Sequence, residues 1–314
     1  MSPSTAFPEP LVIPPLLPHK QTFILLHHRG ANAERFGPAL LSAHIRAPFP
    51  SSGAASCGAD SLTLRAVLPH ARFVFPTAPP SRATIYRRCI INQWFDGWHL
   101  EDGALRREEL QADGLRYTVG FLHELIRREI QLVGGNARDV VLGGLSQGCA
   151  AILVASLLWE GEPLGAVVGM CGWMPYLGHM DEEPSSGNKM SDEADDGFDP
   201  FERSSSSSAS GTSSAAEDIE PADLGLRAVK RLSEELELKR PPYESIPLRQ
   251  TPVFLGHGRQ DDRVPISLAR ETAAFLENTG VTVSLKTYQD LGHWYSADML
   301  HDIAIFVQKT TGWA

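Results

Sequence analysis

The fold is decided by the stretch Arg138-Asp-Val-Val-Leu-Gly-Gly-Leu-Ser-Gln-Gly-Cys-Ala-Ala-Ile-Leu-Val-Ala155. Its β-branched beginning, residues 138–142, predicts a strand, and the apolar run 149–155 predicts a helix. Between them Ser146 occupies the centre of a G-x-S-x-G pattern. In this strand–turn–helix context a serine sits on a sharp turn that exposes its hydroxyl, and larger residues two positions before and after it would collide. We therefore predict that Ser146 is a nucleophile.

A nucleophilic serine of this kind needs an acid and a base later in the chain, in the order Ser, Asp, His. Residues 251–256 predict a short buried strand, and the loop after it contains Asp261 and Asp262. An alternating strand follows, and His293 lies on the loop after that strand. Both loops follow strands, so an aspartate and the imidazole can approach Ser146 from one edge of a sheet. The residues alone leave open which aspartate is the acid.

These residue types predict acyl transfer. Ser146 attacks an acyl carbonyl, His293 takes its proton and returns it to the leaving group, and the aspartate holds the imidazole in the right tautomer. The negative charge that develops on the carbonyl oxygen needs two N–H donors. One is the N–H of Gln147, directly after the nucleophile, and the other lies in the loop after an early strand. We assign that strand to residues 21–26 and the loop to residues 27–37.

Strands alternate with helices along the chain. This alternation predicts an α/β fold with a mostly parallel central sheet and helices on both faces, and it places the catalytic loops at the carboxyl ends of the strands. Further helices are predicted over 106–130, 224–238 and 302–307. A length of 314 residues is compatible with a single domain of this class, which we assign to residues 1–314.

Seven motifs spread over most of the chain point to one family. They are Leu26-His27 with Arg29-Gly30, Phe75-Pro-Thr-Ala-Pro79, Gln93-Trp-Phe-Asp96 with Trp98, Gly143-Gly-Leu-Ser-Gln-Gly148, Cys171-Gly-Trp-Met-Pro175, His257-Gly258 with Asp261 and Val264-Pro265, and Leu291-Gly-His-Trp294. Together they resemble the acyl-protein thioesterase and carboxylesterase family, also called phospholipase/carboxylesterase, of the α/β-hydrolase superfamily.

The resemblance carries several expectations. It implies that Asp261 rather than Asp262 is the acid of the triad, and that the second oxyanion N–H belongs to Arg29. It implies hydrolysis of thioesters on S-acylated proteins, or of short carboxylic esters and lysophospholipids. A related hydrolase of the same fold, such as a dienelactone hydrolase, is less compatible because those enzymes typically carry cysteine at the position of Ser146. We expect no cofactor and no metal, since His27 and His28 have no cluster of ligand-type residues at metal-binding spacing.

The chain departs from the family pattern at one position of the first loop. Where the family usually has Leu-His-Gly, this chain has Leu26-His27-His28. A glycine lets the backbone turn tightly beneath the oxyanion site. His28 fits only if its φ stays negative or if it accepts a left-handed conformation at a cost of about 1–2 kcal/mol. This predicts a distorted oxyanion hole, and it predicts that His28→Gly raises the rate of hydrolysis.

Aromatic residues in these motifs are expected around the mouth of the site. Trp94, Trp173 and Trp294 are the predicted substrate contacts, and with Phe95 and Trp98 they would suit an apolar acyl group. Each of them could equally be part of the core.

Residues 178–225 hold thirteen acidic residues against Lys189 and Arg203, a net charge of −11, so the rest of the chain is close to +1 and the total is −10. This segment is rich in serine and poor in apolar residues, so it predicts a disordered insertion. The insertion and His28 support an alternative hypothesis, in which a catalytically weakened hydrolase acts as an interaction module. The acidic balance and the lack of a basic patch argue against nucleic acid as a partner.

The sequence also predicts the compartment. It contains no apolar run of about 18 residues, and its first ten residues lack the basic and apolar regions of a signal peptide. The four cysteines are scattered, which argues against a disulfide scaffold, and core packing is the expected role of Cys149 and Cys171. We expect a cytoplasmic protein without a transmembrane segment.

Overall fold

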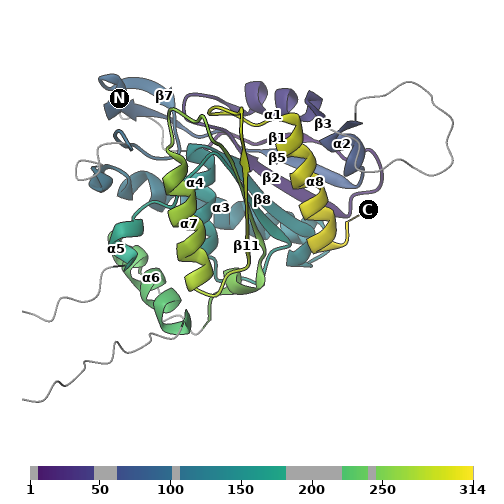
Figure 1. The fold of residues 1–314 in the computed structure, drawn as a ribbon. Coiled ribbons are helices and arrows are strands. Elements are labelled where there is room, and N and C mark those ends of the chain that lie inside the picture. Colours follow the sequence, from purple (N-terminus) through teal and green to yellow (C-terminus); the bar gives the residue numbers. More distant parts are fainter. Residues whose placement is uncertain (1–5, 46–61, 101–106, 182–220, 240–244, 314) are drawn as a thin grey trace, which may run out of the picture.

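The computed structural model describes residues 6–45, 62–100, 107–181, 221–239 and 245–313, and its centre is a seven-stranded sheet (Figure 1). The strand order is β1-β5-β2-β8-β9-β10-β11. β1 pairs with β5 in antiparallel fashion, and every other pair of neighbours is parallel. The strands are β1 (Leu11–Ile13), β2 (Gln21–Leu26), β5 (Ala71–Phe75), β8 (Val140–Leu145), β9 (Ala166–Met170), β10 (Val253–Gly258) and β11 (Val283–Tyr288).

Helices cover both faces of the sheet because the central strands are apolar on both sides. In β2, Ile24 and Leu26 pack in one buried cluster, whereas Phe23 and Leu25 pack in another, as the alternation of side chains along a strand requires. The predicted α/β-hydrolase architecture is confirmed. The first cluster involves α3 (Ala112–Leu132), α4 (Gln147–Leu157), α6 (Pro221–Glu235) and α7 (Ile266–Asn278), and the second involves α1 (Ala33–Ser42), α2 (Leu64–Val67) and α8 (Ala297–Thr311).

Helix α4 directly follows Ser146. All of its residues are buried, because it packs on β8 and β9 and against α3. Its sequence is apolar on every side, as expected of a helix enclosed by other elements. This burial holds the first residue of α4, and with it the end of β8, in a fixed position.

Shorter elements complete the described chain. They are the pairs β3 (His44–Ile45) with β4 (Leu62–Thr63) and β6 (Pro80–Ala83) with β7 (Cys89–Asn92), the helix α5 (Leu177–Asp181), and the 3-10 turns η1 (Thr84–Tyr86), η3 (Glu108–Leu110), η4 (Ala137–Asp139) and η5 (Pro247–Gln250).

Several predicted boundaries were wrong. The elements predicted over 251–256, 224–238 and 302–307 are β10, α6 and α8, which cover Val253–Gly258, Pro221–Glu235 and Ala297–Thr311. The loop assigned to residues 27–37 ends at Asn32, where α1 begins because the side-chain oxygen of Asn32 accepts the N–H of Arg35 and caps the helix. The helix predicted over 106–130 begins at Ala112, after the η3 turn. The strand predicted over 21–26 is confirmed at both ends.

The predicted insertion lies mostly outside the described residues, which leave out 182–220. The parts that are described are helical: α5 reaches Asp181, and α6 begins at Pro221. These two helices pack against each other, and α6 buries Ala228, Val229 and Leu232 in the core. Among the helices described, none combines the length and the apolar character needed to cross a bilayer.

Candidate active site

Ser146 lies on the sharp turn between β8 and α4 with φ 57° and ψ −120°, a conformation outside the usual regions for a residue with a side chain. Close backbone approach explains the glycines around it. A Cβ on Gly144 would lie 2.5 Å from the carbonyl carbon of Gly148. A Cβ on Gly148 would lie 2.6 Å from the carbonyl oxygen of Leu26. The steric reason predicted for the two glycines is therefore confirmed.

Ser146, His293 and Asp261 form a continuous chain of hydrogen bonds. The Oγ of Ser146 lies 2.8 Å from Nε2 of His293. The Nδ1 of His293 lies 2.8 Å from Oδ2 and 3.0 Å from Oδ1 of Asp261. If Nδ1 carries the proton and donates it to the carboxylate, Nε2 is free to accept the serine proton. The three side chains come from the loops after β8, β10 and β11, which meet at one edge of the sheet.

Asp261 is held as a carboxylate by the groups around it. Its side chain is fully shielded from solvent, and burial alone would raise its pKa. Hydrogen bonds from His257 and His293 and from the backbone N–H of Val264 outweigh burial and hold the pKa well below its usual range. Asp262, the alternative acid, is exposed and lines the pocket instead. The geometry thus favours Asp261, the residue that the resemblance implied.

Gln147 and Arg29 lie where the two oxyanion donors are expected. Gln147 is the first residue of α4, so its N–H has no acceptor within the helix. Arg29 lies in the loop that follows β2. That loop is anchored on both sides, since the N–H of Gly30 donates to the carbonyl of Asn92 at 2.7 Å and the N–H of Ala31 to that of His28 at 3.2 Å.

The side chain of His27 holds the same loop through a hydrogen bond. It is fully buried, and burial lowers its pKa to about 4, so the ring is neutral. Its Nδ1–H donates to the carbonyl of His28 at 2.7 Å, and its Nε2 accepts the N–H of Ala78 at 3.0 Å. Both ring nitrogens are therefore engaged, which excludes a role for this neutral ring as a metal ligand in the observed arrangement.

The side chain of Gln147 has a positioning role that sequence reasoning missed. Its Oε1 accepts the N–H of Trp94 at 3.0 Å, and its Nε2 donates to the carbonyl of Phe95 at 2.7 Å. The indole N–H of Trp94 in turn donates to the carbonyl of His27 at 2.7 Å. These buried bonds join α4 to both neighbouring loops. The sequence signal was the polar glutamine at the start of an otherwise apolar helix.

His28 does not distort the loop in the predicted way. Within the described part of the chain it is not among the non-glycine residues with positive φ, and the left-handed conformation falls on Gly30, with φ 81°. The Nδ1–H of His28 donates to the carbonyl of Arg29 at 3.0 Å, and its ring packs edge-on against Trp294 with centroids 5.2 Å apart. Burial lowers the pKa of His28. The loop therefore accommodates the imidazole without backbone strain at this residue.

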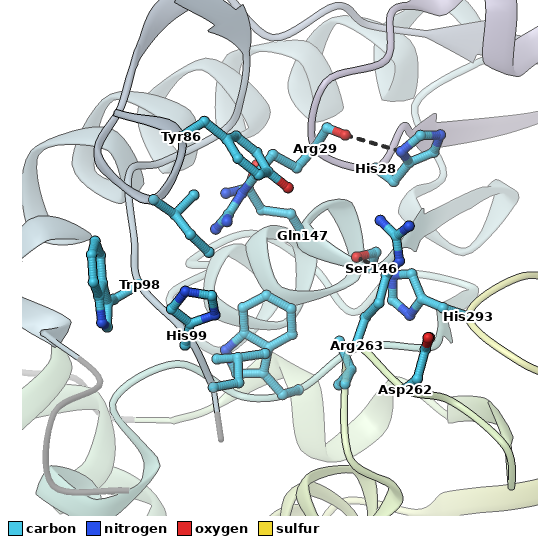
Figure 2. Close-up of a pocket in the computed structure, with 14 residues that line it drawn as sticks. His28, Arg29, Tyr86, Trp98, His99, Ser146, Gln147, Asp262, Arg263 and His293 are labelled. Atoms are coloured by element: carbon cyan, nitrogen blue, oxygen red, sulfur yellow. Dashed lines mark hydrogen bonds between the residues drawn. The ribbon is translucent and has the colours of Figure 1, made fainter. Parts of the chain in front are cut away.

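A pocket of about 340 Å³ opens beside Ser146, with His293 near the serine and Tyr86, Trp98 and His99 farther along it (Figure 2). Trp173 is part of its wall, and its contact with substrate stays a prediction. The lining residues are His28, Arg29, Ile85, Tyr86, Trp98, His99, Leu100, Ser146, Gln147, Trp173, Asp262, Arg263, Val264 and His293.

Two of the predicted tryptophans lie elsewhere. Trp94 is 2% exposed, and its bonds make it a support of the first loop rather than a part of this wall. Trp294 is 41% exposed and packs on His28 and Tyr295 outside the lining. The sequence analysis did not identify Tyr86 and Arg263 as pocket residues. Tyr86 lies outside the seven motifs, and Arg263 lies between the fixed positions Asp261 and Val264 of one motif.

The two cysteines near the site are core residues, as predicted. Cys149 and Cys171 are buried, and burial raises the pKa of both thiols, that of Cys171 to about 12. The thiol of Cys171 donates to the carbonyl of Trp294 at 3.2 Å. A thiol in this state is a poor nucleophile. The sulfur of Cys171 lies close enough to Asp261 and His293 for the three side chains to share a metal ion. The hydrogen bond between Asp261 and His293 explains the proximity of those two side chains without a metal.

Comparisons with known proteins indicate which family the chain resembles. The chain is 23% identical over 303 residues to acyl-protein thioesterase 1 of Gibberella zeae, covering 96% of this chain and 94% of that protein. It is 27% identical over 237 residues to a probable inactive carboxylesterase of Oryza sativa subsp. japonica, covering 75% of this chain and 70% of that protein. The crystal structure of Arabidopsis thaliana SOBER1 superposes with a TM-score of 0.59 at 20% identity, covering 92% of this chain and 98% of that chain.

The family model described as Phospholipase/Carboxylesterase matches residues 51–192 and 236–311, which is more than half of the chain. These residues include Ser146, Asp261 and His293. With its mostly parallel sheet and helices on both faces, the chain belongs to the phospholipase/carboxylesterase family of the α/β-hydrolase superfamily.

Proposed function

We propose that the protein is a serine hydrolase that cleaves carboxylic esters or thioesters through an acyl-enzyme. The observation that carries this proposal is the unbroken line of hydrogen bonds from the Ser146 hydroxyl through His293 to the ionised Asp261. A hydroxyl is a weak nucleophile at neutral pH, and an adjacent oriented base is what activates it.

In the first half of the reaction Ser146 Oγ bonds to the acyl carbon while its proton passes to Nε2 of His293. Asp261 stabilises the imidazolium that forms. The backbone N–H groups of Gln147 and Arg29 bind the carbonyl oxygen as it becomes negative. When the tetrahedral intermediate collapses, the imidazolium gives its proton to the departing thiolate or alkoxide, and the acyl group stays on the serine.

In the second half a water molecule replaces the leaving group. His293 takes a proton from this water, whose oxygen attacks the acyl carbon, and the carboxylic acid leaves when Ser146 regains its proton from the imidazolium. Every proton transfer is carried by side chains of this chain, so the mechanism requires no cofactor or metal.

The substrate that we propose is an acyl ester or thioester, and an S-acylated protein is one candidate because several relatives are named acyl-protein thioesterases. Trp173, Leu100 and Ile85 give the pocket an apolar part that can hold an acyl chain.

A non-enzymatic role is the alternative, and a relative named as a probable inactive carboxylesterase gives it some support. Its other support was His28 at a position that usually holds glycine. This support is weakened because His28 keeps a negative φ and leaves the loop anchored. We therefore favour catalysis over an interaction module.

An active-site fluorophosphonate probe tests the proposal directly. We expect it to label the wild-type protein and Ser267→Ala, a control at an exposed serine of α7, but not Ser146→Ala. His293→Gln should reduce labelling strongly because Ser146 loses its base. Equal labelling of Ser146→Ala, or no labelling of the wild type, would contradict the proposal. Rates with acyl thioesters and p-nitrophenyl esters of increasing length then define the leaving group and acyl length.

A further inference from the structure

Two arginine side chains line the pocket that holds Ser146. Arg29 comes from the loop after β2, and Arg263 comes from the loop after β10 (Figure 2). In the view of Figure 2, Arg29 lies beneath Tyr86, and Arg263 lies beside Ser146 and His293. If a pocket holds only a hydrocarbon chain, a guanidinium group buried beside that chain loses hydration without gaining a partner, which is unfavourable.

The guanidinium of Arg29 lies close to the backbone of Gly97. A Cβ on Gly97 would lie 3.2 Å from its Nη2, so the glycine leaves room for the group. The φ of Gly97 is not positive, and close approach rather than conformation therefore explains this residue. The carboxylate of Asp96 lies near enough to favour the charge, but it accepts hydrogen bonds from Thr84 and from the N–H of Gly97.

Arg29 makes no ion pair within 4 Å among the described residues, although a hydrogen bond with the Tyr86 side chain and the nearby carboxylate of Asp96 favour its charge. Its buried Nε–H also lacks a hydrogen-bond partner there, and burial lowers the pKa of the group. A buried guanidinium whose Nε–H has no partner costs free energy, which an anion bound in the pocket would offset.

Arg263 adds a second positive charge close to the reacting groups. Its backbone N–H donates to Asp261 at 3.0 Å, which fixes the start of its side chain next to the triad. Its charge acts on His28, which lies on the facing loop. The one acidic residue in the lining is Asp262, and both Asp262 and Arg263 are exposed. The two guanidinium groups therefore outnumber the carboxylates of the pocket.

We propose that the substrate of this hydrolase carries an oxyanion, a carboxylate or a phosphate, close to the scissile ester, and that Arg29 and Arg263 bind it. This inference rests on the proposed function and narrows its substrate class. Guanidinium groups recognise carboxylates and phosphates through paired, charge-assisted hydrogen bonds. The backbone N–H of Arg29 is one of the proposed oxyanion donors. An anion bound by the guanidinium of Arg29 therefore lies no farther from the reacting carbonyl than about the length of one arginine side chain.

The test compares matched esters that differ only in this charge. On the acyl side the pair is mono-p-nitrophenyl glutarate and its neutral isostere p-nitrophenyl 4-carbamoylbutanoate. On the leaving-group side the pair is 4-acetoxyphenylacetate and 4-acetoxyphenylacetamide. The measured quantity is the ratio of kcat/KM for the anionic ester to that for the neutral ester, in wild type, Arg29→Gln, Arg263→Gln and the double variant.

We expect wild type to favour the anionic ester of at least one pair by about tenfold or more, as a charge-assisted pair supplies. The ratio should fall toward one in the double variant and be partly restored by Arg29→Lys with Arg263→Lys. It should decrease with added salt. Arg270→Gln removes an exposed charge from α7 outside the pocket and should keep the wild-type ratio. Hydrolysis of the neutral ester reports that each variant is folded.

Binding measurements separate this inference from the proposed function. Glutarate and inorganic phosphate are titrated by calorimetry into wild type and the double variant, with glutaramide as the neutral control. Binding of either anion that is lost in the double variant supports the site and shows which oxyanion it prefers. Ser146-dependent hydrolysis with equal ratios in wild type and double variant would overturn the inference and leave the proposed function standing. Anion binding without Ser146-dependent hydrolysis would overturn the proposed function instead.

Discussion

Protonation of His27 should destabilise the protein as the pH falls below about 6.5. The ring is fully buried beneath the proposed oxyanion loop, and burial lowers its pKa to about 4. Its Nδ1–H already donates to the carbonyl of His28, and its Nε2 accepts the N–H of Ala78. A second ring proton would sit on Nε2, break the bond from Ala78 and leave a buried charge without a partner.

The sign and size of the effect follow from the two pKa values. In the unfolded chain the imidazole has its ordinary pKa of 6.5, so between about pH 6.5 and pH 4 the unfolded chain binds the proton more readily. The free energy of unfolding therefore rises with pH through this window. The contribution is complete above about pH 6.5 and lost as the pH falls through about 4. At 1.36 kcal/mol for each unit between the two values it amounts to about 3 kcal/mol.

Urea unfolding at several pH values between 7.5 and 4 measures this contribution. The variant His27→Gln keeps a donor and an acceptor but does not titrate, so it should start less stable and lose about 3 kcal/mol less than wild type on acidification. His44→Gln, at an exposed histidine, is the matched control and should follow wild type. If wild type and His27→Gln lose stability in parallel, the burial of a neutral imidazole is not what links this loop to pH.

Three further changes test other parts of the site. His28→Gly should lower the rate of ester hydrolysis about five- to tenfold, because the loop loses the hydrogen bond to the carbonyl of Arg29; a faster variant would show that the imidazole obstructs the site. Gly148→Ala should lower the free energy of unfolding by about 1–3 kcal/mol in urea titrations, since its Cβ would meet the carbonyl oxygen of Leu26; an unchanged midpoint would contradict the packing argument. Replacing residues 183–219 by a short Gly-Ser linker should keep fluorophosphonate labelling at the wild-type level, because α5 and α6 remain to pack on each other; loss of labelling in a folded variant would assign this segment to the site.

Local sequence rules predicted the elements that carry the proposed triad. The run before Ser146 is β-branched and apolar, which defines β8, and the glycines on either side of the serine are required by close backbone approach. The strand before Asp261 was recognised by its apolar run and the strand before His293 by its alternation. These signals are local, because a strand or a tight turn is encoded by residues within a few positions of one another.

The conformation of His28 depends on long-range contacts, and the sequence left it open between a negative φ and the left-handed region. The rule that a tight loop prefers glycine considers the backbone alone. It does not include Trp294, which packs on the imidazole from the far end of the chain, nor Gly30, which takes the left-handed conformation in place of His28. Trp94 was misjudged for a similar reason, since its partners His27 and Gln147 lie far from it in sequence.

The sequence by itself determined the class of fold, and it predicted the proposed nucleophile and the order of the groups that would activate it, because these depend on periodicity, on steric limits of a turn and on the residue types that acid–base chemistry needs. Only the tertiary structure decided which residues form the pocket wall. The guanidinium groups of Arg29 and Arg263 reach one cavity from loops more than two hundred positions apart, and no local pattern records that proximity. The approach of two distant cations is set by the order of strands in the sheet, which brings the loops after β2 and β10 to the same edge.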